Sequence, residues 1–473
     1  MNHTRAKDET PVLLVKLMVL LEAHRSIFGQ ERVYRRAMAL VLAEVFAFGR
    51  HTVTQLMLTL GLVAEDWSAW YRLFSHKRFD EVRAAQVQLK AIVASVPEDQ
   101  VFVTGFDGFQ VPRNSQKMHG TSWLKALNTA HFKPGIHRAQ RFLEGSWLVP
   151  QEHGYSRAIP LRCLAAFPAK AVGSAVDGLK EWQAGVTFLK WLRTSLDELG
   201  RSKQRILALA DGSFDTLGMW QDLPERAALV VRTPRNRALY QLPEGYAGRG
   251  RPPSYGEKAP APAEWLSQRQ TFKRREVLVR GQLRPMRYRI EGPFLRDGLP
   301  HTPLFLIVIG GGQRPPGSRR QRYQPCFYLV SAVQDKDAWG LPLPEQDLLA
   351  WLWQRWELEI CHREMKSAFG LGEKQCWNPE ATVRSVQWSA WVYSLLVLAG
   401  YQAWGLLQGP PPPGRWRKGP QRWSFNTLWR GYRTALWQQP EFRATWSPTQ
   451  GYWPKKEAAM TNLNNAIIGA ARL

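Results

Sequence analysis

The chain has 473 residues, of which 44% are hydrophobic and 12% aromatic, and its formal net charge is +25. The apolar content excludes a disordered chain, and the length predicts two to four structural units rather than one core. A positive charge of this size attracts polyanions, so nucleic acid is the first partner to consider and an anionic membrane the second.

The cysteines and the first residues indicate a reducing, interior compartment. The four cysteines form no Cys-x-x-Cys pair, which disfavours both a zinc finger and a disulfide framework. The apolar run from Pro11 to Leu21 contains Lys16 and follows Asp8 and Glu9, whereas a secretory signal begins with basic residues. We therefore expect a cytoplasmic, nucleoid-associated protein that does not enter the membrane.

Residues 10–95 predict helices, because apolar residues recur there at the helical period and Gly and Pro are rare. Two short helices, Thr52–Leu60 and Asp66–Phe74, are expected to join at Gly61, with Thr52 and Asp66 as N-caps. This spacing fits a helix-turn-helix, and it fits an ordinary helical corner equally well. We interpret residues 1–95 as a helical DNA-binding domain, with plain helical packing as the alternative.

Strand and helix patterns alternate after residue 100. Strands are expected at 101–106, 141–149 and 205–210, and a helix at 176–199. This order predicts an α/β sheet. Asp107 and Asp211 each follow a predicted strand, and the carboxyl ends of strands are where α/β proteins place their chemistry.

A basic, strand-rich stretch occupies residues 224–325. Between Arg232 and Arg322 there are 19 Lys and Arg against 6 Asp and Glu, and 19 − 6 gives +13, about half of the total charge. A solvated surface is the simplest explanation of such a run. The charge density and interleaved aromatic residues favour a nucleic-acid groove instead, with Trp265, Arg274 and Arg275 as candidate contacts.

The remaining chain predicts a strand at 326–333 and two apolar helices. The second helix covers Val383–Trp404 and ends before a proline-rich break at 409–414. Residues 409–473 form a basic, Trp-rich region that we expect to be helical or partly ordered, with no assigned role.

The first of these two helices carries a cationic and acidic face. Arg355, Glu359 and Lys366 stand at i, i+4 and i+11, so all three project from one side. A carboxylate between two cations suits a metal ligand surrounded by phosphate-binding groups. The simpler reading is an i,i+4 salt bridge between Arg355 and Glu359, which alone would be preferred.

Other residues of this helix are expected to anchor it or to line a channel. The opposite side, which should face a core, carries Leu349, Trp353, Trp356 and Ile360. His362 and Arg363 follow Glu359 by one turn and are candidate DNA contacts, although His362 is equally suited to packing.

Three acids from distant parts of the chain form the candidate site: Asp107, Asp211 and Glu359. Phosphoryl transfer on DNA uses two divalent cations, and hard Mg²⁺ prefers oxygen ligands. A single aspartate after a strand is more often a turn former or helix cap, so the prediction rests on the combination. The competing acids nearby are Asp215, Asp335, Glu357 and Glu364.

The spacing Arg355-(3)-Glu359-(6)-Lys366 resembles the Y-(2)-R-(3)-E-(6)-K motif of bacterial insertion-sequence DDE transposases. Asp107-Gly108 resembles the first catalytic block of that family, and the run from Leu209 to Phe214 resembles the second. The resemblance covers about residues 50–400. Leu352 stands where the family has tyrosine, and Phe109 stands where it often has threonine.

The resemblance implies an α/β, multidomain protein with an RNase H-like mixed-sheet core over 96–223 and 326–408, interrupted by the β-rich insertion at 224–325. Asp107, Asp211 and Glu359 would hold two Mg²⁺ ions, for which Mn²⁺ can substitute. Arg355 and Lys366 would contact DNA phosphates, and Trp265 or Trp220 could stack on a flipped terminal base, although core packing is the simpler role for both.

The expected function is therefore DNA transposition, with cleavage at terminal inverted repeats and joining to target DNA by two-metal phosphoryl transfer. The expected partner is double-stranded DNA, bound by a homodimer that holds two ends together. Two alternatives remain open. One is an inactive, transposase-derived DNA-binding protein, and the other is an RNase H-like nuclease that cuts without strand transfer.

Overall fold

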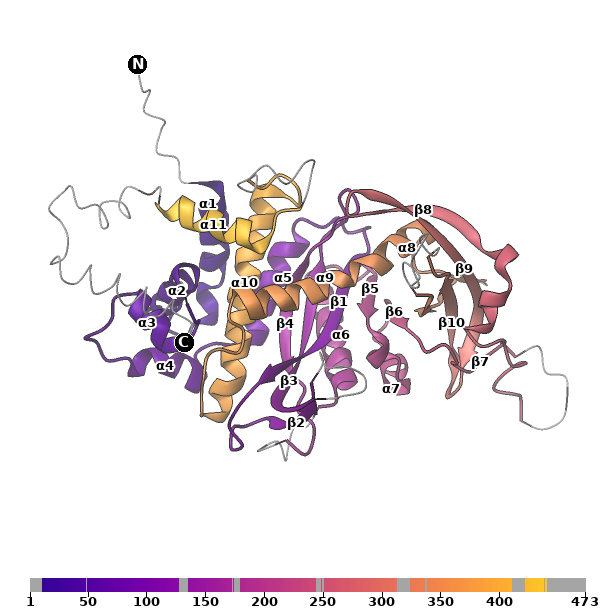
Figure 1. The fold of residues 1–473 in the computed structure, drawn as a ribbon, viewed down its shortest axis with the longest axis horizontal. Coiled ribbons are helices and arrows are strands. Elements are labelled where there is room, and N and C mark those ends of the chain that lie inside the picture. Colours follow the sequence, from indigo (N-terminus) through magenta and orange to yellow (C-terminus); the bar gives the residue numbers. More distant parts are fainter. Residues whose placement is uncertain are drawn as a thin grey trace, which may run out of the picture.

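The computed structural model gives the chain a helical part, a central sheet and a β-rich end (Figure 1). The residues that it describes are 11–47, 49–126, 135–171, 173, 179–243, 248, 251–312, 324–336, 338–410, 422–437 and 439. Most of the region after residue 409 therefore lies outside the described residues.

Five helices form the N-terminal part, as predicted for residues 10–95. They are α1 (Val12–Ala23), α2 (Glu31–Phe46), α3 (Val53–Thr59), α4 (Ser68–Ser75) and α5 (Glu81–Val93). Thr52 caps α3 by accepting a hydrogen bond from the Gln55 amide, and Asp66 accepts one from the Ser68 amide just before α4. Both predicted capping residues therefore bond to the start of the predicted helices.

The central sheet has the strand order of an RNase H-like core. In space the order is β4 (Ala158–Ala165), β3 (Ile136–Leu148), β1 (Phe102–Pro112), β5 (Ile206–Ala210) and β6 (Ala227–Arg232). The first three strands pair antiparallel, whereas β1, β5 and β6 run parallel. Helix α6 (Glu181–Glu198) lies between β4 and β5 in sequence, and β2 (Thr121–Lys125) pairs with the first half of β3.

The predicted insertion does not form a separate sheet. Strand β11 (Cys326–Ser331) pairs with β6 and extends the core sheet through β10 (Leu299–Ile309), β9 (Gln282–Arg296) and β7 (Leu239–Tyr240). Strand β8 (Lys273–Val279) pairs with β9 and has no other partner among the described strands. The short helix α7 (Leu217–Gln221) and the hairpin of β12 (Val333–Asp335) and β13 (Ala338–Gly340) complete this part. Because β6 belongs to the core, the extension begins after residue 232.

Four helices follow the sheet. They are α8 (Glu345–Gln354), α9 (Trp356–Arg363), α10 (Pro379–Trp404) and α11 (Phe425–Trp437), and a π-helical turn at Glu364–Ala368 prolongs α9. Helix α10 starts at the N-cap Asn378 and is buried along most of its length, between the N-terminal helices and strand β4. Its apolar character is thus explained by burial on several sides, and none of the described helices is long and apolar enough to cross a membrane.

The first and last parts of the chain are packed together. Helix α1 lies against α10 and α11. Glu44 of α2 is fully buried 2.6 Å from the Lys374 ammonium, and the Trp429 indole of α11 donates to the Val45 carbonyl. The N-terminal helices therefore share their core with residues that follow α9.

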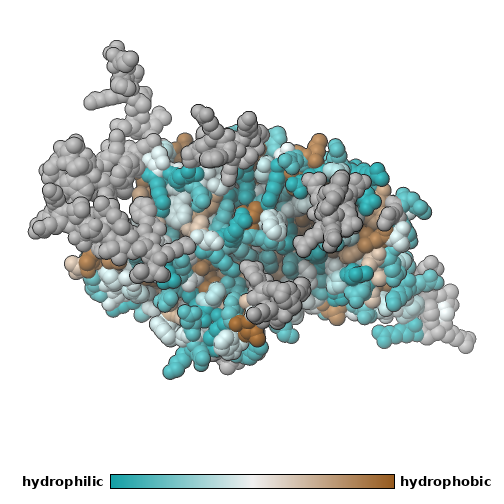
Figure 2. Space-filling view, in the orientation of Figure 1, coloured by the Kyte–Doolittle hydropathy of each residue, from teal (hydrophilic) through white to brown (hydrophobic). Residues whose placement is uncertain are grey.

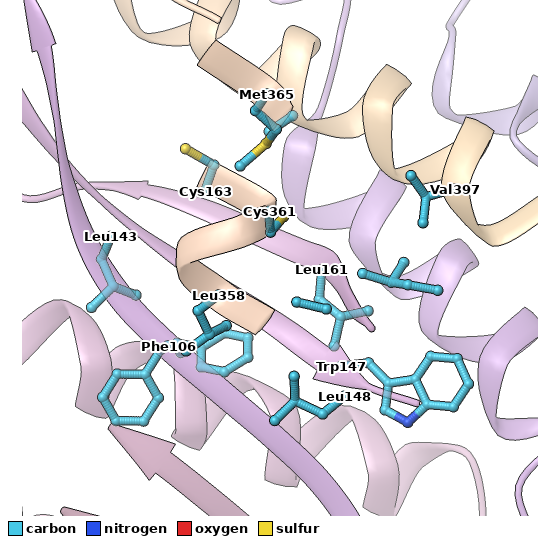
Figure 3. Close-up of a cluster of buried hydrophobic side chains, with 14 of the residues drawn as sticks. Phe106, Leu143, Trp147, Leu148, Leu161, Cys163, Leu358, Cys361, Met365 and Val397 are labelled. Carbon is cyan, nitrogen blue, oxygen red and sulfur yellow. The ribbon is translucent and has the colours of Figure 1, made fainter. Parts of the chain in front are cut away.

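Helix α9 is anchored on the sheet through its apolar side. Figure 3 shows Leu358, Cys361 and Met365 in a buried cluster with Leu143 and Trp147 of β3. The visible outer face of the molecule is mostly hydrophilic, with small separate hydrophobic patches (Figure 2). The fold thus places one side of α9 in the core and leaves another side free for chemistry.

Candidate active site

Strand β1 presents alternate residues to two helices on opposite faces of the sheet. Phe106 packs against Phe188 of α6. On the other face, a side chain at Gly105 would meet Leu358 of α9, and Phe109 lies 5.1 Å from the His362 ring. Asp107 lies between these last two positions and therefore faces α9.

Asp107 and Asp211 lie at the same level on neighbouring parallel strands. Gly105 of β1 is registered with Leu209 of β5, so counting two residues onward on each strand brings the two aspartates level. Asp211 directly follows β5, as predicted. The prediction that Asp107 ends its strand was wrong, because β1 continues to Pro112 by pairing with β3 alone. Asp107 instead marks the point where β1 and β5 part.

Asp211 also caps a short helical turn. Its Oδ1 accepts a hydrogen bond from the Ser213 amide at 2.5 Å, at the start of the 3₁₀ turn Gly212–Phe214. This helix-capping role is the one predicted above as more common for an aspartate that follows a strand. The second carboxylate oxygen has no described partner and remains free for another role.

Arg355 connects Glu359 with Asp107. Its Nη2 lies 2.5 Å from Glu359 Oε1, and its Nη1 lies 3.8 Å from Asp107 Oδ2. Burial lowers the pKa of Arg355, but Glu359, Asp107 and Asp211 together raise it, and the net direction is upward. The guanidinium therefore acts as the shared counter-ion of all three predicted acids.

The surroundings of Asp107 raise the pKa of its carboxyl group. Burial raises its pKa to about 6, helped by the charge of Asp211 and opposed by His362, Arg355 and a hydrogen bond from the Gly108 amide. A carboxyl group with a raised pKa next to a second carboxylate is typical of sites that bind cations or transfer protons.

Lys366 and His362 face the same side of β1. The Lys366 ammonium lies 5.4 Å from the Phe109 ring centre, and burial lowers its pKa against the opposing effect of Asp107. His362 Nε2 lies 2.9 Å from Oε2 of the fully buried Glu144, close enough for an ion pair although not aligned as a hydrogen bond. His362 is therefore a packed residue under the site, whereas Arg363 is exposed.

Three of the four competing acids have other partners. Asp215 is buried and paired with Arg237 and Arg296. It therefore anchors the β-rich end.

The two acids beside Glu359 point away from it. Glu357 is clamped by Arg422 and Arg280, and Glu364 pairs with Arg157 and accepts a hydrogen bond from Tyr393 at 2.7 Å. Asp335, the fourth, is exposed at the end of β12. Of the helix acids, only Glu359 faces Asp107.

The predicted DNA contacts of the basic stretch divide into two groups. Arg274 and Arg275 are exposed on β8, the strand with a free edge. Trp265 is 8% exposed and packs against Phe294 and the Arg289 guanidinium, and Trp220 is buried with its indole donating to Asp215. Neither tryptophan presents a free ring face for stacking.

Trp356 was expected in the core, but it is 49% exposed. The helix is interrupted at Arg355, where the Leu358 amide bonds to the Arg355 carbonyl three residues back, so α8 and α9 do not share one continuous face. Trp356 therefore lies on the outer side of α9.

A cavity beside Arg355 was not predicted. It has a volume of about 280 Å³ and is lined by Arg232, Ile309, Gln324, Cys326, Tyr328, Leu352 and Trp353. Burial raises the pKa of Tyr328 to about 12, while Arg232 and Arg355 oppose that rise. Leu352 and Tyr328 of β11 thus line the same cavity, a proximity that sequence spacing could not reveal because the two residues come from different elements.

The donor set suits a hard divalent cation, although the acids are not gathered around one point. Among the described residues, no three His, Cys, Asp or Glu side chains are close enough together to hold a metal ion. The Arg355 guanidinium, however, stands between Glu359 and Asp107 as a cation in that place. Oxygen donors around a bound positive charge fit Mg²⁺ or Mn²⁺.

No protein-family model matches the chain, and no match was found among curated proteins. Among solved structures, the chain is similar to a cryo-EM structure of the piggyBac transposase synaptic complex with hairpin DNA, at 11% sequence identity and a TM-score of 0.38. The match covers 98% of this chain and 87% of the other. The fold class rests on the strand order described above and not on this likeness.

Proposed function

We propose that this protein is a DNA transposase that cuts at terminal inverted repeats and joins the ends to target DNA by metal-dependent phosphoryl transfer. The observation that supports this best is the level placement of Asp107 and Asp211 on parallel strands, with Glu359 and its arginine over the same face. Two local features favour this placement. Successive side chains of β1 point to opposite faces of the sheet, and Asp211 caps the turn that follows β5.

The three acids would hold two Mg²⁺ ions, with Mn²⁺ as a substitute. When bound, such ions activate the attacking oxygen and stabilise the leaving oxygen. Asp107 and Asp211 provide carboxylates from a rigid sheet, and Glu359 provides one from a helix packed on that sheet. The same site would serve water and then a 3′-hydroxyl as nucleophile.

The cationic residues around the site would bind the DNA backbone. Arg355 and Lys366 face Asp107, and Arg363 is exposed on the same helix. Strand β8 lies along α8, with Lys273 paired to Glu345 at the start of α8 and Arg280 paired to Glu357 at the start of α9. A duplex on the exposed face of β8 would therefore run along α8 toward the start of α9.

The N-terminal helices and a second copy of the chain would take part in assembly on DNA. Helices α3 and α4 would contact DNA as a helix-turn-helix, and a homodimer would hold the two ends together. Imperfect inverted repeats and a short target duplication on either side of the gene would favour an insertion sequence over a free-standing nuclease.

The test uses a supercoiled plasmid that carries the DNA flanking the gene, purified protein and Mg²⁺. We expect end cleavage and strand-transfer products with the parent protein. In Glu359→Gln, cleavage falls by more than about a hundredfold, beyond the loss typical of an outer partner of a metal ligand, while DNA binding in a gel-shift assay is retained. Glu198→Gln, an exposed acid at the end of α6, is the matched control and cuts normally.

Each other outcome selects a different conclusion. If Glu359→Gln cuts as well as the parent, the assignment of the acids is wrong. Cleavage without joined products identifies a nuclease, and DNA binding without any cleavage identifies an inactive, transposase-derived binding protein.

A further inference from the structure

Arg355 makes one contact that a helix-stabilising salt bridge does not require. The i,i+4 pair with Glu359 belongs to the helix itself, but the approach of Nη1 to Asp107 crosses from α9 to the sheet. The two carboxylates thus face each other across a guanidinium, which is the place that a cation shared by both would take. Positive charges this close together in a partly buried site repel each other strongly.

We propose that Arg355 closes the metal site in the DNA-free protein, and that a DNA phosphate must draw its guanidinium away before a divalent cation binds between Asp107 and Glu359. Binding is then ordered, with DNA first and metal second. This inference rests on the proposed function, because it assigns a regulation to the same site.

The surroundings of Arg355 allow such a movement. Its side chain is 23% exposed and that of Glu359 is 36% exposed, so water screens their pair, which makes it weaker than a buried one. A phosphate offers two oxygens to the planar guanidinium and forms a stronger, bidentate contact. An open cavity lined by Leu352, Trp353 and Tyr328 lies near Arg355, whose charge acts on the Tyr328 hydroxyl.

A gate of this kind has a chemical benefit for a DNA-cutting protein. Without DNA, the site would hold no activated water and could not hydrolyse free phosphodiesters. Because phosphate contacts do not depend on base sequence, even a mixed-sequence duplex should open the site at low salt.

The test measures binding of Mn²⁺ by electron paramagnetic resonance, without any assay of cleavage. For the parent protein, we expect weak Mn²⁺ binding alone and tighter binding after a mixed-sequence duplex is added. Arg355→Gln should bind Mn²⁺ without DNA about tenfold more tightly than the parent, equivalent to roughly 1.4 kcal/mol, and DNA should add little further.

Arg205→Gln is the matched control. It removes the same charge from an exposed residue just before β5, at the opposite end of that strand from Asp211, and no described ion pair includes Arg205. Its Mn²⁺ affinity without DNA should equal that of the parent. Thermal melting of both variants checks that they are folded, and the comparison of the parent with and without DNA tests the gate even if Arg355→Gln does not fold.

The outcomes distinguish a failure of the proposed gate from a failure of the proposed function. Equal, tight Mn²⁺ binding by the DNA-free parent and Arg355→Gln would overturn the gate and leave the metal site intact. If neither protein binds Mn²⁺ with or without DNA, the metal site and the proposed function both fail.

Discussion

At the scale of the residue, the folded protein disfavours the negative charge of Asp107. Burial raises its pKa to about 6, and Asp211 adds to the rise. A carboxyl group whose pKa is higher in the folded protein than in the unfolded chain binds more protons when folded, so the free energy of unfolding decreases as pH rises between the two values. The ionised carboxylate of Asp107 therefore costs stability at neutral pH.

This predicts that removing the charge stabilises the protein. The pKa of Asp107 rises from the ordinary value of 3.8 to about 6, so Asp107→Asn should raise the free energy of unfolding above pH 6 by about 2–3 kcal/mol. The gain should shrink as pH falls through 6 and disappear near pH 4. Urea denaturation in chelator at several pH values measures it.

Asp99→Asn is the control for this measurement, because Asp99 is exposed and forms no described ion pair. It should change the free energy of unfolding by less than about 0.5 kcal/mol at each pH. A gain for Asp107→Asn that did not vary with pH would contradict the electrostatic origin.

At the scale of the element, helix α9 is held by acids that take no part in the proposed chemistry. Glu357 and Glu364 flank Glu359 and point inward to arginines and a tyrosine from separate elements. Burial lowers the pKa of Arg422, whose side chain is 11% exposed, and Arg157 stacks on the Trp423 ring. The segment at 422–423 therefore helps to fix the orientation of α9.

Breaking the Arg422–Glu357 pair should lower the free energy of unfolding. Arg422→Met leaves a carboxylate that is 3% exposed with only Arg280 nearby, so the free energy of unfolding should fall by about 3 kcal/mol. Adding Glu357→Gln should restore part of this loss. Chemical denaturation measures both variants.

Arg280→Gln provides the comparison, since its pair with the same carboxylate is 3.5 Å long and Arg280 is 43% exposed. We expect a cost of less than about 1 kcal/mol. Equal losses for Arg422→Met and Arg280→Gln would show that the depth of burial does not determine the strength of these pairs.

Sequence patterns predicted several of the strands but could not predict the partners of helix α9. Apolar patterns and capping residues depend on neighbouring residues in the sequence. The sequence alone therefore predicted β5, α3 and the position of Asp211 directly after β5. The break at Arg355 was not, because it depends on how α8 and α9 each pack, and it turned Trp356 outward. The clamps on Glu357 and Glu364 come from residues far away in sequence, such as Arg157 and Arg422, and no spacing rule connects them.

At the scale of the whole molecule, charge and topology act together. The sheet runs without interruption from the core to β9, and β8 adds a basic strand with a free edge. Asp107 and Asp211 lie just beyond the last paired residues of the parallel strands β1 and β5. Non-specific DNA binding should therefore depend on the β8 side of the molecule and weaken steeply with salt.

The double variant Arg274→Gln with Arg275→Gln tests this distribution. If each arginine contacts one phosphate, the slope of log K against log salt should become less steep by about 2. Fluorescence anisotropy with a mixed-sequence duplex measures the slope. Lys203→Gln with Arg205→Gln removes equal charge from the amino end of β5, away from the acids, and should leave the slope unchanged.

The packing of the N-terminal helices against residues 374–437 has a consequence for the order in which the protein forms. Glu44 has its ammonium partner at Lys374, and the Val45 carbonyl has its indole donor at Trp429. During synthesis these helices leave the ribosome before Lys374 and Trp429, and more than three hundred residues separate the end of α5 from Trp429. Their core is therefore completed long after they are made, and a fragment ending at residue 95 would expose a buried carboxylate and an apolar surface.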